Sequence, residues 1–232
     1  MMPSNLAIVI LAAGASSRLG HSKQLLEIAG NSLIYRVAKI ACALAEAFDL
    51  EQPRIITGKD ADEVEQQLVD FAVSCHFNTH WQQGMGTSIS FAVSELTITE
   101  HTPTELTLTD LTPREKAKSE TSNSKPMPSH ILLMTCDQVL LTFESLSRLI
   151  EKSQANPSAI IVAHYGGTSG IPTIFPQELF EQLRSLKPQQ GAKKLIQEYS
   201  EQTIAVDIPE AIQDLDTLKD EIAVKALFEK LE

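Results

Sequence analysis

The stretch Leu6-Ala7-Ile8-Val9-Ile10-Leu11 is continuously apolar, and the small residues Ala12-Ala13-Gly14 follow it directly. A short apolar run with β-branched residues at its centre is typical of a strand whose two faces are both buried. Strands of this kind occur mainly in parallel sheets that are covered by helices on each face. The stretch therefore predicts the central strand of an α/β fold, and the glycine marks the turn at the carboxyl end of that strand.

Beyond this strand, the sequence alternates between helical and strand patterns. Apolar residues recur at helical spacing over residues 33–48, and the run at residues 54–58 is typical of a second strand. The patterns that follow predict further helices over 62–69, from about 87 onward, over 143–152 and over 178–186, and further strands over 73–77, 131–135, 159–162 and 203–206. This alternation predicts a three-layer α/β sandwich with a mostly parallel sheet and helices on both of its faces.

The length and composition of the chain favour one large core. With 232 residues and 43% hydrophobic side chains, we expect a single domain over residues 1–232. Residues 97–129 differ from the rest, because they are crowded with Thr, Ser, Pro, Glu and Lys and have no sustained periodicity. We expect this stretch to be a flexible surface insertion. A short helix near residues 113–118 is the alternative.

Charge and cysteine usage exclude several classes of function. The formal charge of −11 and the pI near 5.0 disfavour nonspecific binding to nucleic acid, because the field of the protein repels phosphates. The three cysteines have no Cys-x-x-Cys spacing, so the sequence predicts neither a disulfide framework nor a zinc site. The apolar run at residues 6–13 lacks a preceding basic region and is too short to cross a bilayer. We expect a cytoplasmic protein with no nucleic-acid partner and no membrane anchor.

The segment after the first strand, residues 11–24, has the composition of a phosphate-binding loop. Small residues let the backbone approach a phosphate closely, and Gly14 can adopt a positive φ. Arg18 offers a forked set of donors and Lys23 a compact charge, which together suit the β and γ phosphates of a nucleoside triphosphate. The spacing matches neither GxxxxGK[ST] nor GxGxxG. An ordinary strand-to-helix turn also carries glycine and serine, but the pair of cations favours phosphate binding.

Asp137 follows the predicted strand at residues 131–135. Its side chain is therefore expected at the carboxyl edge of the sheet, where ligands bind in open α/β folds. Mg²⁺ prefers hard carboxylate oxygens and fills its other positions with phosphate and water. A lone aspartate at a strand end is also common as a cap or turn residue. The neighbouring Cys136 has no histidine partner evident in the sequence, so we assign it no nucleophilic role.

The loop sequence Leu-Ala-Ala-Gly-x-Ser-x-Arg-x-Gly-x-x-Lys at residues 11–23 resembles the signature of the nucleotidyltransferase superfamily, whose fold is glycosyltransferase-A-like (nucleotide-diphospho-sugar transferase). Within that superfamily, the chain is most similar to the molybdenum cofactor cytidylyltransferase branch. Five further matches to the family follow in the expected order, at residues 78–88, 136–138, 170–175, 191–195 and 214–217. Each match is short, but six in order make the resemblance specific.

The resemblance implies a Mg²⁺-dependent transfer of a nucleotidyl group to a phosphorylated acceptor, with release of pyrophosphate. The Ala-Ala-Gly loop is that of the cytidine-using branch, so CTP is the expected donor and molybdopterin the expected acceptor. The implied catalytic residues are Arg18, Lys23 and Asp137, and the implied metal ligands are Asp137 and Asp216. The nucleotide-binding residues are then Leu11, Ala12, Ala13, Gly14, Ser16, Ser17, Arg18, Lys23, Asn78, Gly84 and Ser88. Asp214 is the alternative to Asp216 as the second metal ligand. The other interpretation of Asp214 is the N-cap of a helix that begins near Thr217.

The chain departs from the family pattern in ways that bear on the acceptor. Val139 and Leu218 each replace a usual proline, Gln190 replaces the usual acidic residue, and Lys193 replaces an arginine. Transfer to another small phosphate acceptor, such as a sugar phosphate, therefore remains open. So does a noncatalytic molybdenum cofactor carrier that delivers its cargo to a molybdoenzyme or its chaperone, although a carrier needs no pair of metal carboxylates. A dinucleotide-dependent oxidoreductase is disfavoured by the missing GxGxxG.

Overall fold

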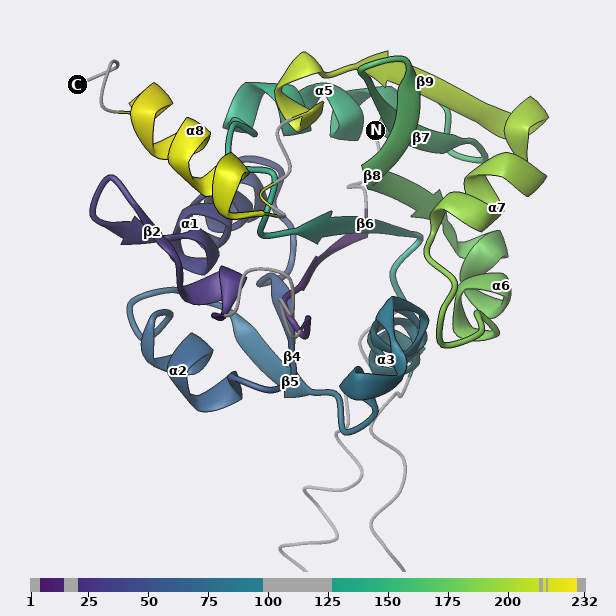
Figure 1. Cartoon of the computed structure of the whole chain (residues 1–232). Coiled ribbons are helices and arrows are strands. Elements are labelled where there is room, and N and C mark those ends of the chain that lie inside the picture. Colours follow the sequence, from purple (N-terminus) through teal and green to yellow (C-terminus); the bar gives the residue numbers. More distant parts are fainter. Residues whose placement is uncertain (1–4, 15–20, 98–126, 213–214, 216, 229–232) are drawn as a thin grey trace, which may run out of the picture.

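The computed structural model describes residues 5–14, 21–97, 127–212, 215 and 217–228 (Figure 1). Its centre is a seven-stranded sheet in the order β5-β4-β1-β6-β8-β7-β9. The strands are β1 (Leu6–Leu11), β4 (Arg54–Thr57), β5 (Ser74–Phe77), β6 (His130–Thr135), β7 (Ile160–Tyr165), β8 (Thr168–Pro176) and β9 (Thr203–Asp207). A small hairpin of β2 (Glu27–Ile28) and β3 (Asn31–Ser32) stands apart from the sheet.

The strand β1 lies at the centre of the parallel half of the sheet, as its sequence predicts. It pairs in parallel with β4 on one side and with β6 on the other. Leu6, Ile8 and Ile10 face one hydrophobic core. The alternate residues Ala7, Val9 and Leu11 face a second core on the opposite side. Burial on both faces explains why the run is apolar at every position instead of at every second one.

Helices cover both faces, which confirms the predicted layers. Figure 1 shows α1, α2, α5 and α8 on one side of the sheet and α3, α6 and α7 on the other. Their bounds are α1 (Leu33–Ala47), α2 (Ala61–Gln66), α3 (Met85–Thr97), α5 (Phe143–Ala155), α6 (Phe180–Arg184), α7 (Lys193–Glu198) and α8 (Leu218–Phe228). Short 3₁₀ turns are η1 (Lys23–Leu25), η2 (Trp81–Gln83), η3 (Gln177–Leu179), η4 (Ser200–Gln202) and η5 (Pro209–Ile212).

The strand β8 is the main element that the sequence did not predict. It runs antiparallel to both β6 and β7, while every other neighbouring pair in the sheet is parallel. Its first half contains Gly170 and Pro172, which are typical of turns, so the pattern indicated only the start of a strand. The sheet is thus mostly parallel, as expected, with one antiparallel strand in its second half.

Several helix boundaries also differ from the sequence patterns. The predicted helix at residues 62–69 ends at Gln66, and the one at 178–186 is divided into η3 and α6. At the start of α8, Thr217 Oγ1 accepts the Asp220 amide at 3.3 Å, while the Asp220 carboxylate accepts the Thr217 amide at 2.8 Å. This reciprocal pair is a helix cap. The N-cap of α8 is therefore Thr217, whereas one interpretation of the sequence placed the cap at Asp214. Asp214 itself lies outside the described residues.

The expected insertion at residues 97–129 falls mostly outside the described residues. The structure describes Thr97 as the last residue of α3 and residues 127–129 as the approach to β6. On that approach, the Ser129 amide donates to the Asn5 carbonyl at 2.7 Å, which aligns β6 with β1. Within the described ranges, no helix combines the length and apolar character needed to cross a membrane.

Candidate active site

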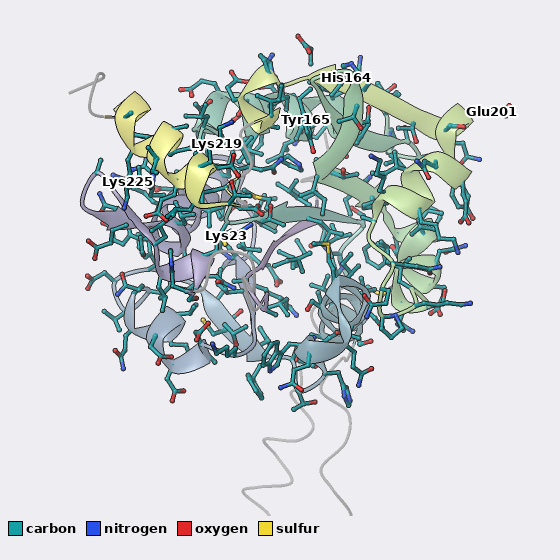
Figure 2. The ribbon with its side chains drawn as sticks, in the orientation of Figure 1. Lys23, His164, Tyr165, Glu201, Lys219 and Lys225 are labelled. Atoms are coloured by element: carbon teal, nitrogen blue, oxygen red, sulfur yellow. The ribbon has the colours of Figure 1, made fainter. Side chains whose placement is uncertain are left out.

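Lys23 and Asp137 meet at the carboxyl edge of the sheet. The ends of β1 and β6 are adjacent, with Leu11 in register with Thr135, and Asp137 follows β6 directly. The Lys23 Nζ lies 2.9 Å from Asp137 Oδ2, and the two side chains are only 13% and 23% exposed. Figure 2 labels Lys23 near the end of β6. The fold therefore brings together two charged residues that the sequence assigned to one site. Ser16, Ser17, Arg18 and Asp216 lie outside the described residues.

The turn that carries Asp137 is held by hydrogen bonds to two distant segments. The buried Gln138 side chain donates from Nε2 to the Ile171 carbonyl at 2.8 Å and to the Ala211 carbonyl at 3.0 Å. The Leu215 amide donates to the Asp137 carbonyl at 3.2 Å. The strand β8 and the segment after β9 are thus both tied to this turn. The residue that precedes Asp216 in sequence is consequently anchored on Asp137.

The first part of the predicted phosphate loop lies against the sheet. Leu11, Ala12 and Ala13 are buried, and the Ala12 amide donates to the Ile56 carbonyl of β4 at 2.9 Å. Gly14 is exposed and does not have a positive φ, so it does not use the conformational freedom of glycine here. Among the described residues, no atom would meet a Cβ at Gly14 within 4 Å. The small residue that the packing requires is instead Gly58, where a Cβ would lie 2.5 Å from the Ala13 carbonyl oxygen.

Gln24 is a residue at this loop that the sequence did not single out. Its Nε2 donates to the Ala12 carbonyl at 2.7 Å and to the Gly14 carbonyl at 2.8 Å. The side chain is 3% exposed, although glutamine is usually a surface residue. No periodicity marks it, because the contact depends on the loop folding back on itself.

The other predicted nucleotide-binding residues lie at the start of α3. The side-chain Nδ2 of Asn78 donates to Thr87 Oγ1 and to Ser88 Oγ, each at 3.1 Å. Both Asn78 and Ser88 are buried. Gly84 has φ +128° and packs against the 187–190 loop, where a Cβ would lie 2.4 Å from the Pro188 carbonyl oxygen. These contacts join the end of β5 to α3, and α3 to the segment before Gly191. Direct contact of the three residues with a nucleotide stays a prediction.

Burial leaves Cys136 without nucleophilic character. The thiol is enclosed in the core beside Asp137, and burial, followed by the Asp137 charge, raises the pKa of Cys136 to about 12. A reactive cysteine needs a lowered pKa, since the thiolate is the nucleophile. The structure thus agrees with leaving Cys136 out of the chemistry.

The chemistry of this edge fits a magnesium ion. Asp137 supplies a hard, partly exposed carboxylate, and among the described residues Lys23 contacts it. Among the described residues, no three His, Cys, Asp or Glu side chains gather into a cluster that could hold a metal. A site built on Asp137 would therefore need ligands from a bound phosphate, from water or from Asp216.

The helix α8 lies beside the start of η1. His21 Nε2 is 3.5 Å from Glu221 Oε2, and Lys225 Nζ is 2.7 Å from Glu221 Oε1. Figure 2 labels Lys219 and Lys225 on this helix. The C-terminal helix therefore adds charged groups next to the loop that carries Lys23.

Comparison with solved structures finds the same fold in several other proteins. The homologue of Mycobacterium tuberculosis Rv0371c from Mycobacterium sp. strain JC1 is 23% identical over 100% of both chains, with a TM-score of 0.70. A nucleotidyl transferase from Methanothermobacter is 17% identical over 98% of this chain and 99% of that one, with a TM-score of 0.71. Rv0371c from M. tuberculosis H37Rv, solved in complex with manganese, is 21% identical over 97% and 100%, with a TM-score of 0.64.

Sequence comparison gives the family. A search of curated proteins found no match to the chain. The model of the MobA-like NTP transferase domain matches residues 8–203, which include most of β1, the loop after it, Lys23 and Asp137. The matched region extends over most of the sheet, from β1 to the first residue of β9. The chain therefore belongs to the family of MobA-like NTP transferase domains and is a nucleotidyltransferase.

Proposed function

We propose that the protein transfers CMP from CTP to a phosphorylated small-molecule acceptor, most specifically molybdopterin, and that the transfer requires Mg²⁺. The observation that carries this proposal is the contact between Lys23 and Asp137 at the end of β1 and β6, directly beside the small-residue loop. One residue is suited to an anionic phosphate and the other to a metal ion that accompanies it. The matched family and the resemblance of the loop to cytidine-using relatives support the choice of reaction and base.

In the proposed reaction, an oxygen of the acceptor phosphate attacks the α-phosphorus of CTP. A new phosphorus–oxygen bond forms as the bond between the α-phosphorus and the bridging oxygen breaks, and pyrophosphate leaves with that oxygen. Lys23, together with Arg18, stabilises the negative charge that accumulates on the leaving group. Asp137, with Asp216, would hold Mg²⁺, which supplies positive charge beside the phosphates when bound. The remaining acceleration comes from holding the two reactants in line, so no covalent enzyme intermediate is needed.

The acceptor would approach from the side of β8. Lys193, at the start of α7, donates from Nζ to Thr168 Oγ1 at 3.3 Å, beside the turn between β7 and β8. It is an exposed cation, and it stands where relatives carry arginine. A single ammonium attracts a phosphate without bidentate geometry, so it is compatible with molybdopterin and with another phosphorylated acceptor.

A ligand-stabilisation experiment tests the nucleotide part of this proposal. The melting temperature is measured with CTP, GTP, ATP, UTP or NAD, each with Mg²⁺, for the native chain and for Asp137→Asn. A ligand at about one hundred times its Kd stabilises the folded state by about 2.7 kcal/mol, a shift of a few degrees. We expect a CTP-selective, Mg²⁺-dependent shift that is largely lost in Asp137→Asn. The matched control is Asp207→Asn, because Asp207 is exposed on the edge strand β9.

The reaction itself is tested by release of pyrophosphate from CTP with molybdopterin and with a panel of sugar phosphates as acceptors. Release with molybdopterin alone supports the full proposal. Release with a sugar phosphate alone retains nucleotidyl transfer and overturns the acceptor. Binding of CTP without release for any acceptor would contradict catalysis and favour the carrier.

A further inference from the structure

Gln24 makes the most complete set of side-chain hydrogen bonds at the loop. Both hydrogens of Nε2 are used, one by the Ala12 carbonyl at 2.7 Å and one by the Gly14 carbonyl at 2.8 Å. The oxygen Oε1 accepts from Ser22 Oγ at 3.0 Å. This pattern fixes which end of the amide is nitrogen, because only the NH₂ group can donate to two carbonyls. One buried side chain thus holds both ends of the turn after β1.

The bond to Ala12 determines which way the backbone amide of Ala13 points. In a trans peptide the N–H is antiparallel to the C=O, so the Ala13 N–H points away from Gln24. The Ala13 carbonyl lies against Gly58, so this packing, and not Gln24, sets the direction of the Gly14 N–H. No acceptor among the described residues meets the N–H of Ala13 or of Gly14. Within the described part of the chain, these two donors at the predicted phosphate loop thus have no acceptor.

We propose that Gln24 is a positioning residue for the triphosphate. It turns the Ala12 carbonyl inward and so presents the Ala13 amide, which shares the same peptide plane, to phosphate oxygens. Its second bond, to the Gly14 carbonyl, holds the other end of the turn. A turn without this constraint could rotate its peptide planes and face phosphate with carbonyl oxygens, which repel it. Gln24 does not touch the nucleotide, because its amide is fully used by the protein. The inference rests on the proposed function, since it assigns the same loop to the triphosphate.

The decisive variant is Gln24→Met, which keeps the length of the side chain and removes both donors. We expect the affinity for CTP with Mg²⁺ to fall about 10- to 100-fold, as for the loss of two hydrogen bonds that preorganise a site. The Ala13 amide is proposed to contact phosphate before and during the reaction, so KM for CTP rises while kcat changes little. Gln24→Glu places a carboxylate against the same carbonyls and should weaken binding further.

Two controls separate positioning from a general loss of stability. His130→Leu removes a bond from a buried side chain to the Pro157 carbonyl at the start of β6, away from the loop, so it should also lower the melting temperature. In amide NMR spectra, the shift of the Ala13 signal on addition of CTP should persist in His130→Leu and disappear in Gln24→Met. Ser22→Ala leaves both loop bonds in place and should change CTP affinity less than about threefold.

The outcomes distinguish this inference from the proposed function. If the native chain binds CTP and Gln24→Met binds it equally well, the role of Gln24 is overturned and nucleotide binding stands. The same holds if Gln24→Met loses stability but keeps its KM and the Ala13 response. If the native chain binds no triphosphate, the proposed function fails first, and the role of Gln24 fails with it.

Discussion

At the scale of single residues, the site depends on a contact between charges that are far apart in the chain. Lys23 and Asp137 are separated by 114 positions, yet their side chains form an ion pair with little exposure. Unlike the ion pairs on the surface, this one stands where a metal and a triphosphate are proposed to bind. In the free protein, Lys23 would then neutralise the charge of Asp137. When the ligands bind, Lys23 would contact the triphosphate and Asp137 the metal ion.

This arrangement predicts opposite effects of Lys23→Met on two ligands. Without the ammonium, the Asp137 carboxylate attracts a cation more strongly, so the affinity of the nucleotide-free protein for Mn²⁺ should rise about 10-fold. The affinity for CTP should fall, because a phosphate contact is lost. Electron paramagnetic resonance of free Mn²⁺ measures the first effect and calorimetry the second. Lys152→Met, at the end of α5, is the matched control, and equal Mn²⁺ affinity in both variants would contradict the prediction.

The pKa of Cys136 predicts how stability depends on alkaline pH. Burial raises this pKa to about 12 from 9.0, so the unfolded chain loses its thiol proton first as the pH increases. The free energy of unfolding should therefore fall between about pH 9 and pH 12, by about 1.4 kcal/mol for each pH unit from this thiol. Urea denaturation at pH 8 and pH 10 should show a smaller fall in Cys136→Ala than in the native chain. Cys75, whose pKa is raised to about 11, contributes in the same direction in both proteins.

At the scale of elements, the turns between them determine where the site residues lie. Sequence patterns predicted most strands and helices, because the alternation of burial along each one is local. They indicated only the start of β8, because Gly170 and Pro172 are also typical of a turn, while the pairing of this strand with β6 and β7 is decided by partners far along the chain. The contact of the Gly84 turn with the 187–190 loop is also nonlocal.

That contact predicts a difference between two glycine substitutions. Gly84 and Gly167 both have a positive φ, so alanine is strained at each. At Gly84 the new Cβ would also lie 2.4 Å from the Pro188 carbonyl oxygen, whereas at Gly167 no described atom lies within 4 Å. Gly84→Ala should therefore cost about 1–3 kcal/mol more than Gly167→Ala in urea denaturation. A similar loss of stability in the two variants would show that backbone strain alone determines the loss, without a contribution from the contact with Pro188.

At the scale of the whole molecule, the two halves of the chain are joined along one seam of the sheet. In the sequence, β1 comes before residues 98–126 and β6 comes after them. The two strands nevertheless pair in parallel at six successive positions. The alternate side chains of both strands contribute to the same two cores. The connection between them is consequently not what holds the halves together.

This topology predicts that the chain tolerates a cut in residues 98–126. A protease site introduced there and cleaved should leave two fragments that elute together and still bind CTP. The reason is that the paired strands and the shared cores remain intact after cleavage. Size-exclusion chromatography before and after cleavage is the measurement, and denaturation in urea is the control that separates the fragments. Dissociation under native conditions would show that the connection is needed for stability.

The sequence by itself determined the fold class and the position of the charged residues along the chain. Those features depend on local patterns, such as the apolar run of β1 and the placement of Lys23 and Asp137 in the segments that follow two strands. Only the tertiary structure decided the antiparallel direction of β8, the packing of Gly84 and the double hydrogen bond of Gln24. Each of these depends on atoms that meet across the fold, and a pattern read along the chain does not contain the distances between them.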